Sequence, residues 1–369
     1  MCNLKAKKNR LVKRDESFKA SVNEVCARLR LLLEESVQKN LTENMLFSGG
    51  VDTSILATVA SKFVHLRGFT CAFEIALAPD IKYAKLMAKR LRIKHFIHYF
   101  NEDKIFEVLP EVVKALDSFD PMEVRNSVTA MIGLKFAKDN GATSIMTGDA
   151  ADELFAGYHI FLRLKKEKLS EELRKMWNVM TFSSIPLGKS IGIEVKIPYL
   201  DPDFKSFAMD LDPQYKIQRE EGQVWGKWIL RKAYEDVLPE EIAWRDKNPI
   251  EVGSGTTILP SFFNKRIPDS EFKEKKRKYL ESDKVIIRDK EQLVYYEAYR
   301  SVLGVPHPTD PKGRRCPQCN SNVPENATVC RTCGAYPITP NGSTITAESY
   351  ANKQKPFQRN SNGVHGSKL

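Results

Sequence analysis

A regular alternation of strand-like and helix-like segments, between about residues 40 and 160, most constrains the fold of this chain. Short apolar runs with the length of strands alternate with longer segments whose apolar residues recur at helical spacing. The strand-like runs are 44–47, 69–77, 95–100 and 144–147, and the helix-like segments are 55–64, 81–91, 106–116 and 124–138. This alternation predicts an α/β fold, a doubly wound parallel sheet covered by helices on both faces. Ligands bind such sheets at the carboxyl ends of the strands.

The segments before and after this core differ in composition. Residues 1–16 are polar and basic, which predicts a flexible arm. Residues 17–305 are expected to form one domain, in which a sheet part at about 40–160 is followed by a mostly helical part at about 161–305. Apolar residues at helical spacing over 17–39 predict one amphipathic helix ahead of the sheet.

Beyond residue 305 the composition shifts toward proline, glycine and cysteine. A small cysteine-containing module is expected at 314–337. Residues 338–369 are rich in asparagine, serine, glycine and lysine, which predicts a disordered tail.

Composition limits the class of protein. At 369 residues with 42% hydrophobic content, the chain can bury a sizeable core. No apolar run approaches the roughly 20 residues that span a bilayer, and the basic N-terminus lacks the apolar stretch of a secretory signal, so a cytoplasmic protein without a membrane partner is expected. The net charge of +11 favours anionic partners such as nucleotides, phosphates or RNA without choosing among them.

The sharpest local motif is SGGVDTS at 48–54, between a predicted strand and a predicted helix. Its two glycines allow close backbone approach and positive φ, so that amides can point at phosphate oxygens. The hydroxyls of Ser48, Thr53 and Ser54 and the helix N-terminus add further attraction for an anion. The motif lacks the Gly-Lys-Ser/Thr ending that grips β and γ phosphates in kinases and GTPases, so those classes are disfavoured.

SGGVDTS resembles the PP-loop signature of the ATP pyrophosphatases, and three further segments resemble one branch of that superfamily, the asparagine synthetases. These segments are SIMTGDAADELFAGY (144–158), GIEVKIPYLD (192–201) and KWILRKAYEDVLPEEIAWRDK (227–247). The resemblance spans about residues 40–260 in the family's order. It implies a PP-loop ATP pyrophosphatase fold, of the adenine nucleotide alpha hydrolase-like type.

The resemblance also implies that ATP and Mg²⁺ bind here. Asp52 and Asp152 match the family's metal-side aspartates, and Lys227 matches its catalytic lysine. Asp149 stands where the family usually has a glutamate in the chemical steps, and Arg125 matches an arginine near the pyrophosphate. The other residues that match nucleotide-binding positions are Leu46, Phe47, Ser48, Gly49, Gly50, Thr53, Ser54, Phe73, Ile75, Thr147, Gly148 and Glu153. Asp80, Arg245 and Lys247 match family elements as well.

The reaction implied is attack of a small-molecule carboxylate, aspartate or similar, on the α phosphorus of ATP. Ammonia or an amine then displaces AMP to form an amide. Residues 1–43 are too few for the glutaminase domain of glutamine-dependent asparagine synthetases, so ammonia is expected from solution or from a separate glutaminase, and Cys2 is expected to be a coincidence of position. Ile185 replaces a polar residue of the family near the second substrate, which leaves the acceptor open.

Four cysteines near the C-terminus form two pairs, Cys316 with Cys319 and Cys330 with Cys333. Four thiolates in this pattern resemble a zinc ribbon and predict a closed, structural Zn²⁺ site; a disulfide framework is the alternative. Such ribbons recruit nucleic acid or protein, and nearby arginines would suit an anionic partner.

Two other functions compete with the amide ligase. One is a PP-loop enzyme that adenylates a base of tRNA, favoured by the net charge and the ribbon. The other is a non-catalytic nucleotide-binding module, favoured by the shorter Asp149 and the altered 185–190 segment.

Overall fold

The computed structural model describes residues 2–220 and 222–338, with side chains described from Ser21 onward. Its contacts divide the chain into two units. The first, here called the sheet unit, comprises the residues up to 116 together with 123–266, and the second, the cysteine unit, comprises 117–122 and the residues from 267 onward. The expected disordered tail lies outside the described residues, except for Ile338.

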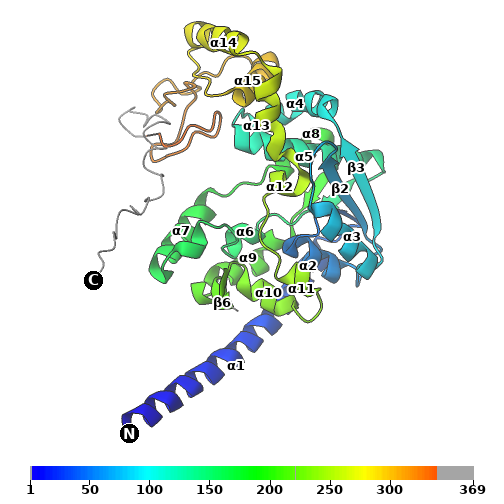
Figure 1. Cartoon of the computed structure of the whole chain (residues 1–369), viewed down its shortest axis with the longest axis vertical. Helices are drawn as coiled ribbons and strands as arrows, with labels where there is room; N and C mark the ends of the chain where they lie inside the picture. The colour runs from blue at the N-terminus through cyan, green and yellow to red at the C-terminus, as the bar shows by residue number, and fades with distance from the viewer. Residues whose placement is uncertain (1, 221, 339–369) are drawn as a thin grey trace, which may run out of the picture. The chain divides into compact units, whose positions relative to one another are not determined.

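Five parallel strands form the main sheet of the sheet unit, in the order β3-β2-β1-β4-β5. Figure 1 labels its neighbouring strands β2 and β3. The strands are β1 (Asn44–Leu46), β2 (Arg67–Phe73), β3 (Lys94–Phe100), β4 (Ser144–Met146) and β5 (Glu194–Lys196). The predicted parallel α/β sheet is therefore confirmed, with β5 as an additional edge strand. From β1 the chain adds β2 and β3 on one side of the sheet and then returns to add β4 and β5 on the other side. The order of the strands therefore reverses between β1 and β4.

Helices pack on the sheet through buried apolar residues. In α4, the buried residues Ile105, Val108, Leu109, Val112 and Val113 recur at the three- and four-residue spacing of one helix face. Buried phenylalanines of the strands stack across β2 and β3, with the rings of Phe73 and Phe100 5.5 Å apart. The helices that follow the first three strands are α2 (Val51–Ala60), α3 (Asp80–Leu91), α4 (Glu102–Leu116) and α5 (Pro121–Asp139).

The first helix, α1 (Cys2–Lys39), is longer than predicted. Its backbone is already helical from Cys2, so residues 2–16 begin this helix instead of forming an arm without an element of its own. Lysine, arginine and leucine, which are common in this segment, have high helix propensity, and that propensity outweighed the missing apolar periodicity. The C-terminal part of α1 packs against α9 (Pro202–Asp210) and α10 (Trp228–Tyr234).

Helices predominate in the rest of the sheet unit, interrupted by the hairpin β6 (Gln218–Glu220) and β7 (Gln223–Trp225). The remaining α-helices there are α6 (Ala151–Leu154), α7 (Lys166–Val179), α8 (Ser184–Ile191), α11 (Glu240–Ala243), α12 (Ile250–Ser254) and α13 (Leu259–Arg266). None of the described helices combines the length and the hydrophobicity needed to cross a bilayer.

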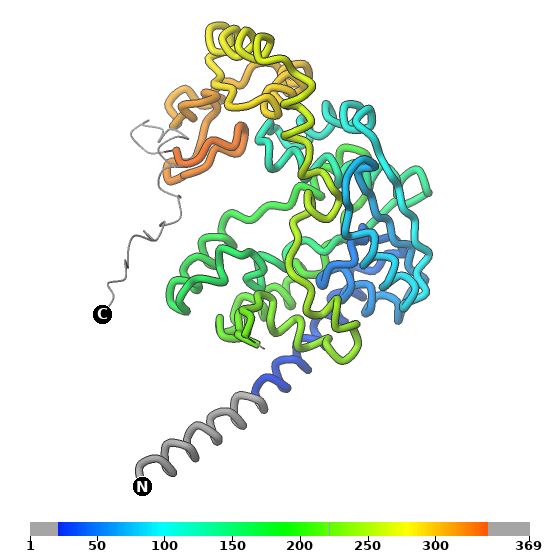
Figure 2. The backbone as a smooth tube through the Cα atoms, viewed as in Figure 1, coloured from blue at the N-terminus to red at the C-terminus, as the bar shows by residue number. Residues whose placement is uncertain are grey.

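The cysteine unit is built around α14 (Asp269–Ser282) and α15 (Lys290–Leu303). Tyr296 of α15 packs edge-on against Tyr279 and donates a hydrogen bond to Asp283 at 2.6 Å. Gln292 of α15 donates from its Nε2 to the carbonyl of Cys333 at 2.9 Å, so the cysteine-bearing loops, orange in Figure 2, rest on this helix pair. The composition predicted that residues 267–305 belong to one domain with the rest of 17–305. The contacts instead group them with the cysteine module.

Candidate active site

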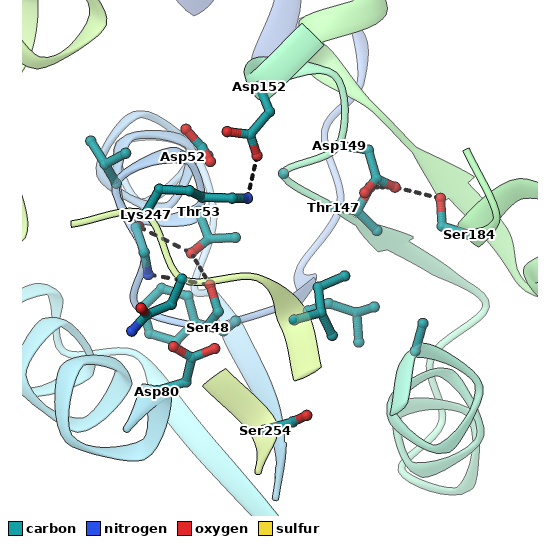
Figure 3. A pocket seen from close by; sticks show the side chains of 18 of the residues that line it. Ser48, Asp52, Thr53, Asp80, Thr147, Asp149, Asp152, Ser184, Lys247 and Ser254 are labelled. Atoms are coloured by element: carbon teal, nitrogen blue, oxygen red, sulfur yellow. Dashed lines mark hydrogen bonds and ion pairs between the residues drawn. The ribbon is translucent and has the colours of Figure 1, made fainter. Parts of the chain in front are cut away.

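The candidate site lies where the chain reverses across the sheet, at the carboxyl ends of β1 and β4. Turns that follow two neighbouring strands diverge at such a point and leave a crevice between them. A cavity of about 300 Å³ opens here, within the sheet unit. Its lining includes residues from the β1–α2 turn, the β4–α6 turn, α5, the start of α8, and the segment 245–254 (Figure 3).

The β1–α2 turn is shaped as an anion cradle. Gly49 has φ +66°, and a Cβ atom there would lie 2.2 Å from the backbone nitrogen of Ala84 in α3, so only glycine fits. The Ser48 hydroxyl accepts a hydrogen bond from the Gly50 amide at 3.2 Å and lies 3.1 Å from the Thr53 hydroxyl. The first backbone bond of α2 runs from the Ser54 amide to the Gly50 carbonyl, so the preceding amides of the helix have no intrahelical acceptor. These amides and the helix dipole can hold phosphate oxygens.

Two aspartates and two lysines form a buried ionic cluster at the same turn. Lys227 Nζ lies 2.8 Å from Asp52 Oδ2 and 2.8 Å from Asp152 Oδ1, and its side chain is only 2% exposed. Lys247 donates a charge-assisted hydrogen bond to the other oxygen of Asp152. Burial opposes ionisation of Asp152, but Lys227 and Lys247 outweigh it and hold the pKa of this carboxyl well below its usual range. Lys227 therefore holds the carboxylates of Asp52 and Asp152, from two neighbouring segments of the site, close to each other.

The backbone holds this cluster in place. Lys227 has a left-handed backbone, φ +54°, at the start of α10, and its amide donates to the Phe155 carbonyl at 2.8 Å. Gly157 leaves room for Asp152, since a Cβ atom at position 157 would lie 1.9 Å from Asp152 Oδ1. The buried Tyr199 hydroxyl donates to the Asp52 carbonyl at 3.1 Å. A left-handed lysine beside a fixed carboxylate costs conformational energy, which is common at functional sites.

Asp149 faces away from the ionic cluster. Its Oδ2 accepts hydrogen bonds from the hydroxyls of Thr147 at 2.9 Å and Ser184 at 2.5 Å, as Figure 3 shows. Burial raises the pKa of Asp149, partly offset by those two hydrogen bonds. A raised pKa makes the Asp149 carboxylate a stronger base than an ordinary aspartate, and this carboxylate borders the cavity.

A second ion pair borders the cavity. Arg245 donates from Nη2 to Asp80 Oδ1 at 2.7 Å, and its guanidinium carbon lies 3.8 Å from the centre of the Tyr83 ring. The Nη1 group of Arg245 is buried without a hydrogen-bond partner among the described residues. Burial raises the pKa of Asp80, and Arg245 partly offsets it. Arg245 therefore retains donor capacity for a ligand.

Glu153 and Tyr158 form a further hydrogen-bonded pair in the lining. The Tyr158 hydroxyl donates to Glu153 Oε1 at 2.5 Å. Burial raises the pKa of Glu153 above its usual range despite this hydrogen bond. The pair therefore adds a second buried carboxyl with a raised pKa beside Asp149.

Most of the site residues predicted from the sequence border this one cavity. These are Leu46, Phe47, Ser48, Gly50, Asp52, Thr53, Thr147, Gly148, Asp149, Asp152, Glu153 and Lys227, with Asp80, Arg245 and Lys247. Gly49 and Ser54 are not part of the lining, because Gly49 packs on α3 and the Ser54 side chain is buried.

Besides Gly49 and Ser54, three further predicted residues lie outside the cavity wall. Phe73 is fully buried against Phe100, and Ile75 is 59% exposed beyond the end of β2. Phe69, Thr70 and Cys71 of the same strand line the cavity instead. Arg125 lies on α5 one turn before Thr129. Thr129 lines the cavity but Arg125 does not, so the phosphate contact predicted for Arg125 stays a prediction.

Sequence reasoning missed several lining residues that carry hydroxyl or amide groups. They are Thr70, Thr129, Tyr158, Ser183, Ser184, Asn248 and Ser254. For Ser184 a signal existed, since it directly precedes the altered 185–190 segment. Ile185 itself is 47% exposed and is not part of the lining, so the loss of a polar residue there leaves the described wall unchanged.

The four C-terminal cysteines lie together in the cysteine unit. Their Sγ atoms all lie within 4.8 Å of one another, with Cys316 and Cys333 3.6 Å apart and Cys319 and Cys330 3.7 Å apart. Those separations exclude disulfides, whose sulfurs are about 2.05 Å apart. They match a tetrahedron of thiolates about 2.3 Å from a central zinc, whose edges measure about 3.8 Å.

The two cysteine pairs have the same backbone geometry. The amide of Asn320 donates to the Cys316 carbonyl at 2.9 Å, and that of Gly334 to the Cys330 carbonyl at 2.8 Å. Both closing residues are left-handed, with φ of +65° and +72°. The two cysteine pairs noted in the sequence therefore lie together in space. The four thiolates could hold a metal ion and would leave it no open coordination position.

Comparison with known proteins identifies the family. The family model described as asparagine synthase matches residues 28–185 and 187–301. Among curated proteins, the chain is 30% identical over 267 residues to an asparagine synthetase [glutamine-hydrolyzing] of Zea mays, covering 65% of this chain and 45% of that protein. It is 31% identical over 252 residues to asparagine synthetase [glutamine-hydrolyzing] 1 of Arabidopsis thaliana, covering 62% and 43%.

The chain spans about half the length of the curated relatives it matches. Among solved structures, an NH3-dependent NAD synthetase from Campylobacter jejuni aligns with a TM-score of 0.27 and 14% identity, over 59% of this chain and 97% of that one. The family match runs through both turns of the site, the ionic cluster and the segment 245–247. On this evidence the chain belongs to the asparagine synthase family.

Proposed function

We propose that this chain is an ATP-dependent, AMP-forming amide ligase. It adenylates the carboxylate of a small molecule with release of pyrophosphate, and ammonia or an amine then displaces AMP. The observation that carries this proposal is the position of Asp52 and Asp152, from two neighbouring turns, beside Lys227 and the phosphate-binding turn in one cavity.

The residues at the cluster fit Mg²⁺. Asp52 Oδ1 is buried and has no hydrogen-bond partner among the described residues, so one carboxylate oxygen is available to a ligand. Carboxylate oxygens are the protein ligands that Mg²⁺ prefers, and it usually binds through one or two of them together with phosphates. Asp52 and Asp152 would hold the ion, which would neutralise charge on the phosphates.

The chain's own residues supply binding and charge stabilisation. The amides of the β1–α2 turn hold the outer phosphates, which leaves the α phosphorus facing the rest of the cavity. A substrate carboxylate oxygen bonds to that phosphorus as its bond to the bridging oxygen breaks, and pyrophosphate leaves. Lys227 stabilises the negative charge that develops there, which is typically the largest contribution an enzyme makes to such a step.

Amide formation requires a second nucleophile and a proton acceptor. The nitrogen attacks the acyl carbon, the bond to AMP breaks, and the nitrogen loses a proton. Asp149, with its raised pKa, is the carboxyl we assign to accept that proton. We propose a small carboxylate such as aspartate as the acceptor and ammonia, free or delivered by a separate glutaminase, as the nitrogen donor.

We also propose that the four-cysteine cluster binds a structural zinc ion, since an all-cysteine set leaves no position for substrate. The anionic partner predicted for the ribbon gains no support from Arg314, whose guanidinium donates to the carbonyls of Glu325, Ala327 and Ile338. Arg315 likewise donates to the Pro311 carbonyl. These two arginines stabilise the loops of the ribbon, so the tRNA-modifying alternative gains no support from them.

Pyrophosphate release from Mg-ATP tests the ligase directly. The chain is incubated with ammonium and a panel of free amino acids, or with bulk tRNA. Release that requires a small carboxylate and ammonium supports the proposal, release that requires tRNA contradicts it, and no release under any condition supports a binding module instead.

Asp52→Asn is the matched variant for this assay. It should lower the rate by about 10²-fold or more, because a neutral amide holds less tightly the Mg²⁺ that would neutralise the phosphates. Asp203→Asn, an exposed aspartate paired with Lys39, is the control and should leave the rate unchanged. An undiminished rate in Asp52→Asn would refute the assignment of the cluster.

A further inference from the structure

A second groove of the sheet unit lies at the edge strand β3 and the C-terminal half of α3, away from the candidate active site. It is lined by Lys85, Ala88, Lys89, Arg92, Ile93, Lys94, His95 and Ile97. Four of these side chains are cationic, three are apolar, and none is acidic. The groove therefore combines an apolar floor with a positive rim.

The cations of the rim have no carboxylate partner in the part of the chain that the structure describes. Elsewhere on α3, Lys82 lies 3.5 Å from Glu241, and Arg90 donates to the Val237 carbonyl. By contrast, the structure gives no ion pair to any of the four cations of the groove within the residues it describes. Uncompensated positive charge around a groove attracts an anionic partner.

The backbone of β3 offers hydrogen-bonding groups beside this rim. Strand β3 is at the edge of the sheet and pairs with β2 alone among the described strands. The Lys94 amide points to β2, where it donates to the Leu66 carbonyl, and the Phe100 carbonyl accepts from Glu74 on the same side. Because these groups alternate along a parallel strand, the amides and carbonyls of His95, Ile97 and Tyr99 point outward.

Arg92 lines the groove at the end of α3. It adopts the left-handed conformation there, φ 56°, at the position where glycine is usual. A residue other than glycine is strained in this conformation, and strained residues are common at ligand contacts.

We propose that this groove binds an extended acidic segment of a partner protein, which adds to β3 as a further strand. Main-chain hydrogen bonds to the outward groups of β3 would supply affinity, and alternate acidic side chains would face the cations of α3. Nucleic acid has no peptide groups to pair with the strand edge. A second copy of this chain, with its net charge of +11, would be repelled.

Protection of the edge is the competing explanation for part of this charge. Lysine on an edge strand discourages pairing between sheets, and Lys94 alone would serve that purpose. Lys85 and Lys89 lie on the helix and not on the strand, so edge protection does not require them. The two explanations differ in what an acidic peptide should do.

The test is fluorescence anisotropy of a labelled nonapeptide, with glutamate at every second position and valine between, titrated with the full chain. The proposal predicts saturable binding that weakens with added salt. The variant Lys85→Glu/Lys89→Glu should weaken binding about tenfold or more, because two attractive charges become repulsive. The control Lys189→Glu/Lys265→Glu changes the net charge equally at exposed sites elsewhere and should bind as the native chain does.

Two further probes separate strand addition from general attraction to anions. A peptide of the same sequence and charge with a methyl group on every backbone nitrogen has no amide to donate to the strand edge and should bind at least about tenfold more weakly. Equal binding of that peptide, or of a single-stranded oligonucleotide of equal charge, would overturn the proposal. So would the absence of peptide binding at millimolar concentration, or a folded Lys85→Glu/Lys89→Glu variant with unchanged affinity. Pyrophosphate release is not involved, so the outcome is independent of the proposed ligase activity.

Discussion

Replacing Asp152 by asparagine should destabilise the folded chain strongly at neutral pH. The native cluster balances two carboxylates against two ammonium groups, with Asp152 contacting both lysines. Asparagine is nearly isosteric but neutral, so the substitution leaves one uncompensated positive charge. The side chains of Asp152 and Lys227 are 12% and 2% exposed, so water can screen that charge only weakly.

The magnitude follows from the burial of the pair. Removing one partner of a buried ion pair costs about 3–5 kcal/mol of the free energy of unfolding. Asp203, by contrast, is 67% exposed where it meets Lys39, and pairs of that kind contribute about 1 kcal/mol or less. Asp203→Asn is therefore the matched control for an aspartate-to-asparagine change.

The pH dependence gives a second, independent signature. Burial opposes the charge of Asp152, but its two lysines hold its pKa below the usual value. A carboxyl whose pKa is depressed by folding stabilises the folded state fully above its unfolded pKa, about 3.9, and loses that contribution as the pH falls toward the folded value. The difference between the native chain and Asp152→Asn should therefore be constant from pH 7 to 5 and shrink below about pH 4.

Urea denaturation of both proteins at a series of pH values measures these differences. The double variant Asp152→Asn/Lys247→Met restores the charge balance and should recover part of the lost stability. A loss below about 1 kcal/mol at pH 7, comparable to an exposed pair, would refute the buried-cluster reasoning. So would a difference that stays constant down to pH 3.

Three further outcomes are expected. Lys227→Met should abolish pyrophosphate release from Mg-ATP while the far-UV circular dichroism spectrum stays native. Measurable turnover in this variant would contradict the catalytic role assigned to Lys227. Burial lowers the pKa of Lys216 to about 7, so above that pH the folded state binds fewer protons than the unfolded state. The free energy of unfolding should therefore rise from pH 7 to 9 by up to about 3 kcal/mol. Lys216→Met should abolish this rise, and an unchanged rise in that variant would contradict the lowered pKa. Metal analysis should find about one zinc per chain, lost in Cys316→Ser and kept in Cys26→Ser, and equal zinc in both would contradict the ribbon.

Much of the sheet could be predicted from the sequence because its signals are local. Four strands and the helices between them carry apolar periodicities that a single segment displays by itself. Strand β5 was missed because two of its three residues, Glu194 and Lys196, are charged, so it gives no apolar run; β1 and β4 are equally short but lie within such runs. The extent of α1 was missed for the opposite reason, since helix propensity acted where no apolar face was visible.

The site residues that could be predicted are those whose place follows from the strand order, and those missed depend on packing. Asp52 and Asp152 lie in the first turns of the helices that follow the neighbouring strands β1 and β4, so the topology alone brings them together. The hydrogen bond between Asp149 and Ser184 joins residues 35 positions apart and depends on how α8 packs, which no local pattern encodes. Phe73 fills the core between the sheet and its neighbours, and a family match without packing cannot distinguish that from a ligand contact.

A crystal structure with Mg²⁺ and an ATP analogue that resists cleavage between the α and β phosphates would show where the nucleotide binds. We expect the outer phosphates at the amides of the turn from Ser48 to Thr53, and a metal ion bound by Asp52 and Asp152. A nucleotide bound elsewhere, or a turn left empty with both aspartates still paired to Lys227, would contradict this expectation.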